Sequence, residues 1–333
     1  MNILGIETSC DETSASVVKN GRTLLSNVVA SSLSDHQKYG GIIPEIASRR
    51  QLEFITIVTM KALSSAGLKL TDIDAIAYTK KPGLIGSLLV GISFANSLSF
   101  ALNKPLIPVN HIHAHIYANF LVDKAKDKGQ DLFSELPLPA IGLVVSGGHS
   151  SLFSIKNFQS FRVFGQTRDD AAGEAYDKVA RILDLGYPGG PVIDKLSRTV
   201  KDNDIRFLCA PLAGTNDFSF SGIKTAVLYY KQKHGAKKDF SIPRVAHAFQ
   251  EGVVNILVEK SLLACQKRKA KTLLVGGGVA ANTILRSRLE ARGREVGIRV
   301  SFPAMSLCMD NAAMVAGLAY HCQRPSVKNA VLC

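Results

Sequence analysis

Two histidines four residues apart could hold a metal ion. His111 and His115 stand in the segment His-Ile-His-Ala-His, and on a helix this spacing places both imidazoles on one face while His113 points away. Asp310 is the best candidate for a third ligand. A polar helix face explains the histidines as well, and Asp310 could instead be the N-cap of the Ala-rich segment that follows it. A zinc protease would need a glutamate directly after the first histidine, where Ile112 stands.

Four glycine-containing loops could bring backbone amides close to a phosphate or an adenine. The loop at 276–282 lies between an expected strand and an expected helix, a common context for nucleotide binding. It has neither the Lys-Ser/Thr ending of a P-loop nor the Gly-x-Gly-x-x-Gly spacing, and a tight structural connection is an equal explanation. Three further glycine loops favour the nucleotide hypothesis, at 82–86, 146–149 and 187–191.

Acidic side chains near these loops could contact a ribose or a metal-bound water. Glu174 and Asp177 stand three residues apart in an expected helix and therefore share a face. Because acidic residues early in a helix also complement its dipole, the pattern favours a structural role for Glu174 and leaves Asp177 open. Ser9, Asp11 and Glu12 form a polar loop that resembles a phosphate-facing turn, although hairpin loops are commonly polar.

The elements that must position these residues begin with a duplicated pattern. An apolar run at 2–6, a polar loop and an apolar run at 15–18 precede Asn20-Gly21, which is a strong hairpin signal. The same order recurs with apolar runs at 140–145, 152–155 and 161–164. We expect two nucleotide-binding lobes whose loops meet in a cleft. The alternative is a chance similarity of two hairpins.

Segments with helical periodicity alternate with the strands, which indicates an α/β architecture. We expect amphipathic helices over 45–66 and 169–185. Two further helices are expected over 242–269 and 283–291, on either side of a strand at 272–275.

Composition favours a globular protein with a polyanionic partner. The 333 residues are 46% hydrophobic, which excludes a disordered chain. Lys and Arg number 40 against 27 Asp and Glu, so the net charge is +13, and such an excess attracts nucleic acid. With no Trp, recognition would rest on phosphates and shape. Basic clusters occur at 49–50, 80–81, 231–238, 267–271 and 286–299.

The sequence predicts a cytoplasmic protein. Six cysteines without a Cys-x-x-Cys spacing favour a reduced setting, and the first twelve residues do not resemble a signal peptide. The uncharged stretch 83–102 is long enough to cross a bilayer, but Gly, Ser and Asn fill eight of its 20 positions. We expect a buried helix there and no membrane association.

A series of motifs runs along nearly the whole chain. The motifs lie at 5–13, 39–45, 111–115, 146–149, 169–178, 187–191, 218–225, 277–282 and 308–311. In this order they resemble those of one family, the universal tRNA threonylcarbamoyladenosine transferases, called TsaD in bacteria. One departure is Lys81, which stands where the family has a glycine and puts the local turn geometry in question.

The resemblance implies an α/β protein with the two-lobed, actin- and hexokinase-like (ASKHA) ATPase fold and duplicated lobes. We expect an N-terminal lobe over 1–110, completed by a C-terminal helix at about 303–333, and a C-terminal lobe over 111–302, with the active-site cleft between them. The family transfers the threonylcarbamoyl group from threonylcarbamoyl-adenylate to N6 of the adenosine 3′ of the anticodon in tRNAs that read ANN codons. AMP is released.

The resemblance also assigns residues. His111, His115 and Asp310 would hold one divalent metal ion, iron or zinc. The adenylate, or ATP or ADP in the same place, would contact Val144, Val145, Ser146, Gly147, Gly148, Asp177, Gly190, Asp194 and Asn282. Further candidates are His149, Glu174 and two lysines that could contact phosphate, Lys178 and Lys224.

Family members act on tRNA together with a catalytically silent paralogue, TsaB, and a P-loop ATPase, TsaE, and a separate synthase supplies the adenylate. The stretch 83–102 or the helix that begins at Glu45 could supply a partner face. Two other functions stay open at this point. One is a small-molecule kinase of the same fold, which would not need the charge of +13. The other is a nucleotide-regulated nucleic-acid-binding or chaperone-like module without turnover, marked by strongly salt-dependent binding.

Overall fold

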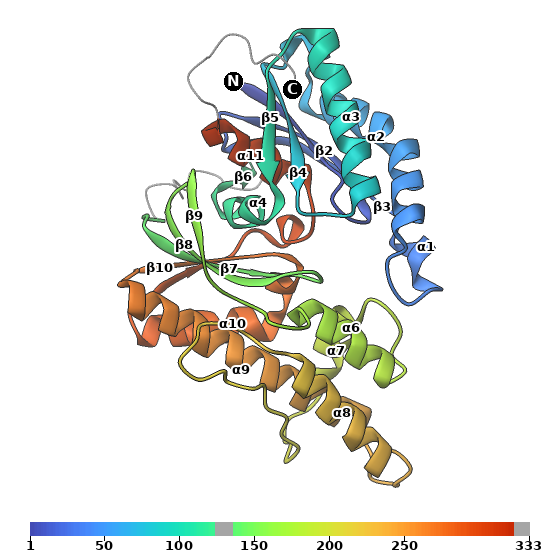
Figure 1. Cartoon of the computed structure of the whole chain (residues 1–333), viewed down its shortest axis with the longest axis vertical. Coiled ribbons are helices and arrows are strands. Elements are labelled where there is room, and N and C mark those ends of the chain that lie inside the picture. The colour runs from blue at the N-terminus through green and yellow to red at the C-terminus, as the bar shows by residue number, and fades with distance from the viewer. Residues whose placement is uncertain (124–135, 323–333) are drawn as a thin grey trace. The chain divides into compact units, whose positions relative to one another are not determined.

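The computed structural model describes residues 1–123 and 136–322 (Figure 1). The chain forms two compact units. Unit 1 consists of Met1–Leu33, Ile43–Leu132 and Asp310–Cys333, and unit 2 of Ser34–Ile42 and Phe133–Met309.

This division differs from the expected boundary between residues 110 and 111. Helix α4 (His111–Tyr117) packs against helix α11 (Ala312–Cys322), and the Tyr117 hydroxyl donates a hydrogen bond to the Gly21 carbonyl. These contacts place α4 in unit 1. The expected C-terminal helix over 303–333 is α11 in the described part of the chain, and 323–333 lie outside the described residues.

Unit 1 is built on a six-stranded sheet in the order β5-β4-β1-β2-β3-β6. β1, β2 and β3 are antiparallel neighbours, while β4 pairs parallel with β1 and β5 parallel with β4. Asn20 and Gly21 both have positive φ angles, 53° and 70°, as a tight hairpin turn requires. The strands are Asn2–Glu7 (β1), Glu12–Lys19 (β2), Thr23–Ser31 (β3), Ala75–Lys81 (β4), Leu106–Asn110 (β5) and Val122–Asp123 (β6).

Helices cover both faces of this sheet. α2 (Pro44–Ala66) and α3 (Ile85–Leu102) lie side by side and pack on strands β2 to β4 (Figure 1). α11 packs on β1 and β2 from the other face, where a Cβ on Gly5 would meet the Ala312 carbonyl oxygen at 2.4 Å. The remaining short helices here are α1 (Leu33–Gln37), η1 (Leu70–Asp72) and η2 (Ala118–Phe120).

The expectation that the apolar stretch 83–102 is buried is wrong. In α3 only Ser87, Gly91 and Ala95 are buried, and these small residues at a spacing of four let the helix approach the end of β1. Phe100 is 92% exposed and Ile85 78%. Among the described residues, α3 is also the one helix long and apolar enough to cross a membrane by length and composition.

Unit 2 repeats the strand topology of unit 1. Its sheet has the order β11-β10-β7-β8-β9, with β7, β8 and β9 antiparallel and β10 parallel to both β7 and β11. The duplicated opening predicted from the sequence is thereby confirmed. The strands are Ala140–Val145 (β7), Ser150–Asn157 (β8), Ser160–Gln166 (β9), Thr272–Gly276 (β10) and Arg299–Ser301 (β11).

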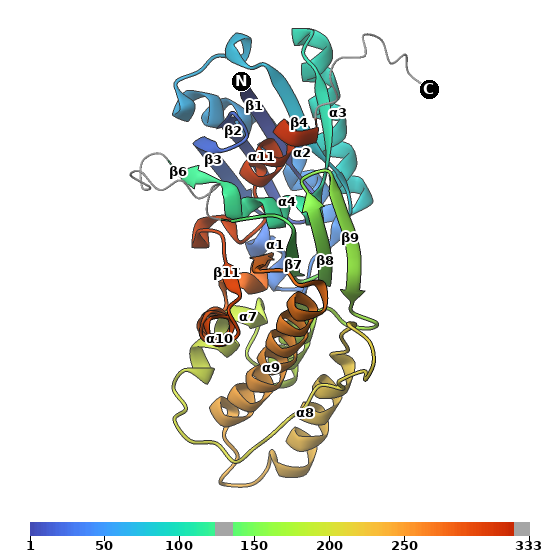
Figure 2. The same cartoon turned by 90° about the vertical axis from the view of Figure 1, so that its left-hand side faces the viewer.

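The long helix α9 (Ile242–Arg268) forms the centre of the core of unit 2 (Figure 2). Its Val245, Phe249, Val253 and Leu257 are fully buried at helical spacing, and the helix packs on β7 and β10 and on its helical neighbours. The other helices are α6 (Ala172–Ile182), α7 (Gly189–Ser197), α8 (Ser221–His234), η3 (Gly278–Ala281), α10 (Thr283–Glu295) and η4 (Met305–Leu307).

The predicted helices agree with α2, α9 and α10, but α6 is shorter than the expected 169–185. It begins at Ala172 because Asp169 accepts hydrogen bonds from the backbone amides of Phe220 and Ser221 and is held outside the helix. A side chain that bonds amides elsewhere in the chain competes with helix formation.

Candidate metal and adenylate sites

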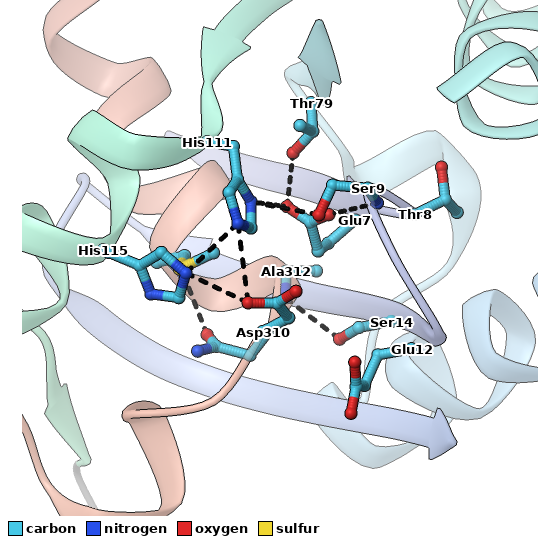
Figure 3. A network of polar contacts seen from close by, with 12 residues as sticks. Glu7, Thr8, Ser9, Glu12, Ser14, Thr79, His111, His115, Asp310 and Ala312 are labelled. Carbon is cyan, nitrogen blue, oxygen red and sulfur yellow. Dashed lines mark hydrogen bonds and ion pairs between the residues drawn. The ribbon is translucent and has the colours of Figure 1, made fainter. Parts of the chain in front are cut away.

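His111, His115 and Asp310 converge in unit 1 (Figure 3). The two Nε2 atoms lie 3.2 Å apart. Asp310 Oδ1 is 3.0 Å from Nε2 of His115 and 3.5 Å from Nε2 of His111. Both histidines are buried, and Asp310 is partly exposed. Three ligand-type atoms therefore form a compact triangle with one open side.

This triangle fits a single metal ion. In a tetrahedral site with bonds of about 2.0–2.1 Å, neighbouring ligand atoms lie roughly 3.3–3.4 Å apart, which is the spacing found among these three atoms. Two imidazoles and one carboxylate suit zinc or iron and leave coordination positions for a substrate oxygen or water. Metal binding thus fits the geometry better than a merely polar helix face.

Local structure explains how the ligands reach one point. Asn110, at the end of β5, caps α4 by accepting a hydrogen bond from the amide of His113, so α4 begins at His111. Asn311 caps α11 in the same way, with its side chain accepting from the amide of Met314. The N-cap of α11 is therefore Asn311 and not Asp310, whose carboxylate faces the histidines.

Glu7 is a functional candidate that the sequence reasoning missed. Its side chain is completely buried at the end of β1, with Oε2 3.1 Å from Nδ1 of His111 and accepting a hydrogen bond from the Thr79 hydroxyl. Oε1 accepts from the amide of Ser9. A carboxylate that binds the far nitrogen of a metal-ligating imidazole fixes its tautomer and orientation. The only sequence signal is an acid ending an otherwise apolar strand.

The carboxylates set the protonation of this cluster. Burial by itself would lower the pKa of His111, but the negative charges of Asp310 and Glu7 outweigh it and raise that pKa to about 9. Burial by itself would raise the pKa of Glu7, but His111 and the Thr79 hydroxyl bring it below its usual range. The two carboxylates therefore favour the protonated form of His111, and because a metal-ligating imidazole must be neutral, metal binding would be coupled to loss of that proton.

The loop of Ser9, Asp11 and Glu12 borders the metal cluster. The Ser9 hydroxyl lies 3.2 Å from Nδ1 of His111. Burial, together with the charges of Asp11 and Asp310, raises the pKa of Glu12 well above its usual range. These surroundings are acidic, which disfavours a phosphate at this loop in the absence of a bound cation.

In unit 2, Val144 and Val145 end a completely buried strand and aim the loop that follows. The loop is closed by a hydrogen bond from the Ser146 amide to the His149 carbonyl and another from the His149 amide to the Ser146 hydroxyl. At Gly147 and Gly148 a Cβ would meet nothing within 4 Å. The two glycines therefore present open backbone to a ligand.

Gly277, in contrast to Gly147 and Gly148, has no free space around it, because the end of β7 lies very close. Its φ is 90°, and a Cβ there would meet the Val145 carbonyl oxygen at 2.3 Å. Only glycine fits this turn.

Asp194 and Asn282 belong to one buried network centred on Gln250, which the sequence reasoning also missed. Gln250 donates to Asp194 Oδ1 and accepts from Asn282 Nδ2. Thr283 donates to Asp194, and Asn282 Oδ1 caps α10 through the amide of Leu285. Asp194 and Asn282 are thus linked through Gln250, and their polar atoms are largely engaged within the protein.

Asp177 lies in α6, and Gly190 lies at the start of α7. The Gly189 amide donates to Asp177 Oδ1 at 2.7 Å, while a Cβ on Gly190 would meet nothing within 4 Å. Asp177 also lines a hollow of about 260 Å³ together with Arg181 and Tyr187. Burial raises the pKa of Asp177 despite the Gly189 hydrogen bond.

Lys178 and Lys224 are already paired. Their ammonium groups contact the two oxygens of Asp170 at 2.7 and 2.9 Å. Glu174 pairs with Lys178 and accepts from the amide of Ala171 at the start of α6, which supports its structural interpretation. These lysines therefore clamp α6 to α8, and a phosphate would have to compete with Asp170.

Lys81, the departure from the family motif, ends β4 with its side chain exposed and faces Asn110 in the register of β5. Two residues later, a Cβ on Gly83 would meet the Ser9 carbonyl oxygen at 2.6 Å. The glycine that packs closely in this turn is thus retained, and the lysine points outward.

Residues 23–317 match the family model described as TsaD, tRNA N6-adenosine threonylcarbamoyltransferase. The chain belongs to this family. It is 49% identical over 96% of its length, and 92% of the relative's, to the tRNA N6-adenosine threonylcarbamoyltransferase of Clostridium kluyveri. The enzyme of the same name from Clostridium botulinum strain 657 is 50% identical over 96% of this chain and 92% of its own length. The one from Syntrophomonas wolfei is 48% identical over 96% of this chain and 91% of its own length.

Solved structures of low identity support the fold of this TsaD-family chain. Full-length HypF, in a phosphate- and nucleotide-bound form, is similar with a TM-score of 0.60 and 14% identity over 96% of this chain and 46% of HypF. Component A of the (R)-2-hydroxyglutaryl-CoA dehydratase of Acidaminococcus fermentans is similar with a TM-score of 0.55 and 14% identity, over 96% of this chain and 98% of component A. The predicted ASKHA-type α/β fold is confirmed. The TsaD-family chain is a transferase that threonylcarbamoylates tRNA.

Proposed function

We propose that the chain transfers the threonylcarbamoyl group from threonylcarbamoyl-adenylate to N6 of the adenosine 3′ of the tRNA anticodon, using one divalent metal ion held by His111, His115 and Asp310. The observation that carries the metal role is the triangle of 3.0, 3.2 and 3.5 Å formed by their ligand atoms. In the reaction the amine nitrogen attacks the carbamoyl carbon and gives up one proton to water, the bond from that carbon to the phosphate oxygen breaks, and AMP leaves with the bonding electron pair.

Iron or zinc at this position would supply Lewis-acid polarisation of the threonylcarbamoyl group. The side chains around it have their own tasks. Glu7 holds His111 so that Nε2 faces the ion, and Ser9 and Thr79 hold Glu7 or His111 by hydrogen bonds. Because the threonylcarbamoyl group is already activated as an adenylate, we propose that the protein acts mainly by binding and orienting the two substrates.

In unit 2 we assign adenylate binding to the backbone rather than to the acidic side chains. At Gly147, Gly148 and Gly190 a Cβ would meet nothing within 4 Å, so phosphate or ribose oxygens can approach the backbone there. Asp194 and Asn282 act chiefly by holding α7 and α10 through Gln250. Asp177 holds the start of α7 through Gly189.

For the catalytically silent paralogue that the family resemblance implies, we propose the exposed apolar face of α2 and α3 as the contact surface. Leu52, Ile57 and Met60 of α2 and Ile85 and Phe100 of α3 are each more than half exposed. Contiguous apolar surface of this kind marks protein interaction sites. The P-loop ATPase and the adenylate synthase are further proposed partners.

We propose the cytoplasm as the location. The five described cysteines are all free of disulfides, which agrees with a reducing compartment.

The test is threonylcarbamoyl transfer by the purified chain with its metal retained, preformed threonylcarbamoyl-adenylate and unmodified tRNA, with and without the partner proteins. Nucleoside mass spectrometry detects the product. Modified adenosine that disappears after chelation and returns with added metal is expected. Transfer that survives complete metal removal would refute the metal role, and no transfer even with partners would refute the proposed reaction.

A further inference from the structure

The excess positive charge of the chain is concentrated in one short stretch. Residues 267–299 contain nine Lys and Arg against two Glu, a net charge of +7 out of the total +13. The stretch covers the C-terminal end of α9, strand β10, helix α10 and the start of β11. It brings together two of the basic clusters that the sequence singled out, and the metal and adenylate sites use neither of them.

The structure separates the cations of this stretch into two groups. Arg286, Arg288 and Arg292 are engaged internally: Arg286 bonds the carbonyls of Ala280 and Pro303, and the other two pair with acids, Arg288 with Glu251 and Arg292 with Glu295. These three have structural tasks.

The second group has no acidic partner. Among residues 1–123 and 136–322, no carboxylate forms an ion pair with Lys267, Arg268, Lys269, Lys271 or Arg294. All five side chains are exposed. Lys267 only contacts the amide oxygen of Asn216, and Arg268 only stacks over the ring of Phe164.

Two of these cations line a hollow. A cavity of about 420 Å³ is lined by both lysines of the α9–β10 turn, Lys269 and Lys271, and has apolar walls from Ala270, Val296 and Ile298. Lys269 has φ 53° at the C-cap of α9, and this left-handed turn carries the chain from α9 into β10. Arg299 adds a further exposed cation, because it stands beside Thr272 in the β10–β11 register and its amide bonds the Lys271 carbonyl.

The helix dipole does not account for this arrangement. Cations in the last turn of a helix are stabilised by its negative end, which explains Lys267 and Arg268 of α9. Lys271 comes from the α9–β10 turn, Arg299 from the start of β11 and Arg294 from the last turn of a different helix, α10. Exposed like charges gathered from separate elements repel one another, so their convergence indicates an anionic ligand.

We propose that this basic edge, defined as Lys267, Arg268, Lys269, Lys271, Arg294 and Arg299, binds the sugar-phosphate backbone of the tRNA substrate. It is a docking surface separate from the residues assigned to the metal and the adenylate. The cations contact phosphates, and the apolar walls of the hollow take a ribose. Because such contacts carry no base information, the edge contributes affinity for tRNA in general and leaves the choice of adenosine to the active site. The inference rests on the proposed transfer of a group to tRNA.

The test compares two variants with the same loss of charge. The edge variant carries Lys269→Gln, Lys271→Gln and Arg299→Gln. The control carries Lys233→Gln, Lys237→Gln and Lys238→Gln, three exposed lysines in the last turn of α8 and the turn that follows it. Binding of fluorescently labelled, unmodified tRNA is measured by anisotropy between about 50 and about 200 mM salt, where phosphate contacts have their largest effect. Thermal unfolding checks that both variants fold.

We expect the edge variant to bind tRNA about 10-fold or more weakly, with the slope of log K against log salt reduced by roughly two to three, about one per lost phosphate contact. The control variant should lose less than about 3-fold. Equal losses in both variants would overturn the proposal, because only net charge would then matter.

Unchanged tRNA affinity in the edge variant, with loss of a partner protein in size-exclusion chromatography, would overturn it in favour of a protein interface. Transfer assays separate this inference from the proposed reaction: the edge variant should keep its kcat while KM for tRNA rises. A wild-type chain that binds tRNA at the edge but transfers nothing would sink the reaction and leave the docking surface intact.

Discussion

The metal cluster of unit 1 and the Gln250 network of unit 2 are both made of buried polar side chains, but they leave different atoms for chemistry. In the cluster, three ligand atoms point at one spot, and Glu7 and Asn311 do the supporting work. In the network, Asp194 and Asn282 bond their neighbours and the backbone glycines stay open. In the first site the side chains are available to bind a ligand, and in the second they hold the backbone in place.

The largest effect should come from removing one of the side chains available to bind a ligand. His111→Ala is expected to abolish stoichiometric metal binding and to lower transfer by roughly 100- to 10,000-fold, since a Lewis acid is worth several kcal/mol. Stability should also fall, because the buried Glu7 carboxylate loses its contact with His111. Metal content by mass spectrometry and transfer by nucleoside analysis are the measurements. His113→Ala on the same helix is the control and should keep its metal. An unchanged metal content in His111→Ala would show that His111 is not a metal ligand.

The next largest effect should come from Glu7, which contacts the far nitrogen of His111. Glu7→Gln places an amide nitrogen where the carboxylate accepts hydrogen bonds from His111 or Thr79. We expect metal affinity to fall about 10- to 100-fold, as for other carboxylates behind a ligating histidine, while the variant still folds. A competition titration with a chelator measures this. Thr79→Ser keeps the hydroxyl and should resemble the wild type, and equal metal affinity in Glu7→Gln would deny Glu7 a positioning role.

In unit 2 the effect should appear in stability first. Asn282→Ala removes the cap of Leu285 and the donor to Gln250, so the free energy of unfolding should fall by about 1–2 kcal/mol. Urea unfolding measures it. Asn282→Asp keeps the cap acceptor but sets a carboxylate oxygen against Gln250 Oε1, so it should recover only the capping part of the loss. If Asn282→Ala instead weakened adenylate binding with no loss of stability, Asn282 would be available to bind a ligand, like His111.

The smallest effect is a pH dependence at the clamp of α6. Burial would raise the pKa of Asp170, but the hydrogen bonds with Lys178 and Lys224 outweigh it and lower the pKa. The ion pairs therefore stabilise the fold at pH values above the ordinary pKa of an aspartate carboxyl group. This stabilisation is lost as the pH falls through the lowered pKa of Asp170. Because both lysines are about a third exposed, we expect Asp170→Asn to cost about 1 kcal/mol at pH 7.

That cost should shrink below pH of about 4, where the wild type also loses the pairs. Unfolding midpoints of wild type and Asp170→Asn across pH measure it, with the exposed Asp202→Asn as control. A gap between the two proteins that stays constant down to acid pH would contradict the clamp.

Much of the fold follows from local patterns. The duplicated hairpin openings and the long helices α2, α9 and α10 were predictable because apolar periodicity and Asn-Gly turns are short-range signals. The proposed ligands His111 and His115 could be grouped from the sequence because a spacing of four residues on a helix is also a short-range signal. Glu7 and Gln250 were not, because each acts through a partner that lies far away in the sequence, and nothing local marks such a partner.

The burial of 83–102 was also misjudged from sequence. Apolar composition shows that a helix can be buried, but only packing decides which face is covered. In α3 that face holds small residues, where a Cβ on Gly91 would meet the Thr8 hydroxyl oxygen at 2.2 Å. The large apolar side chains remain on the outer face, where composition alone cannot place them.

The position of α11 in the chain sets an order of assembly during synthesis. The amide of Ala312 donates to the Ser14 hydroxyl, 298 residues away, and Asp310 stands just before it. All residues up to α11 must therefore leave the ribosome before the sheet of unit 1 receives its second helical layer. Most of unit 2 is one continuous segment, 133–309, that emerges earlier and can fold first. The metal site is completed last, so a nascent chain cannot capture its ion prematurely with the full ligand set.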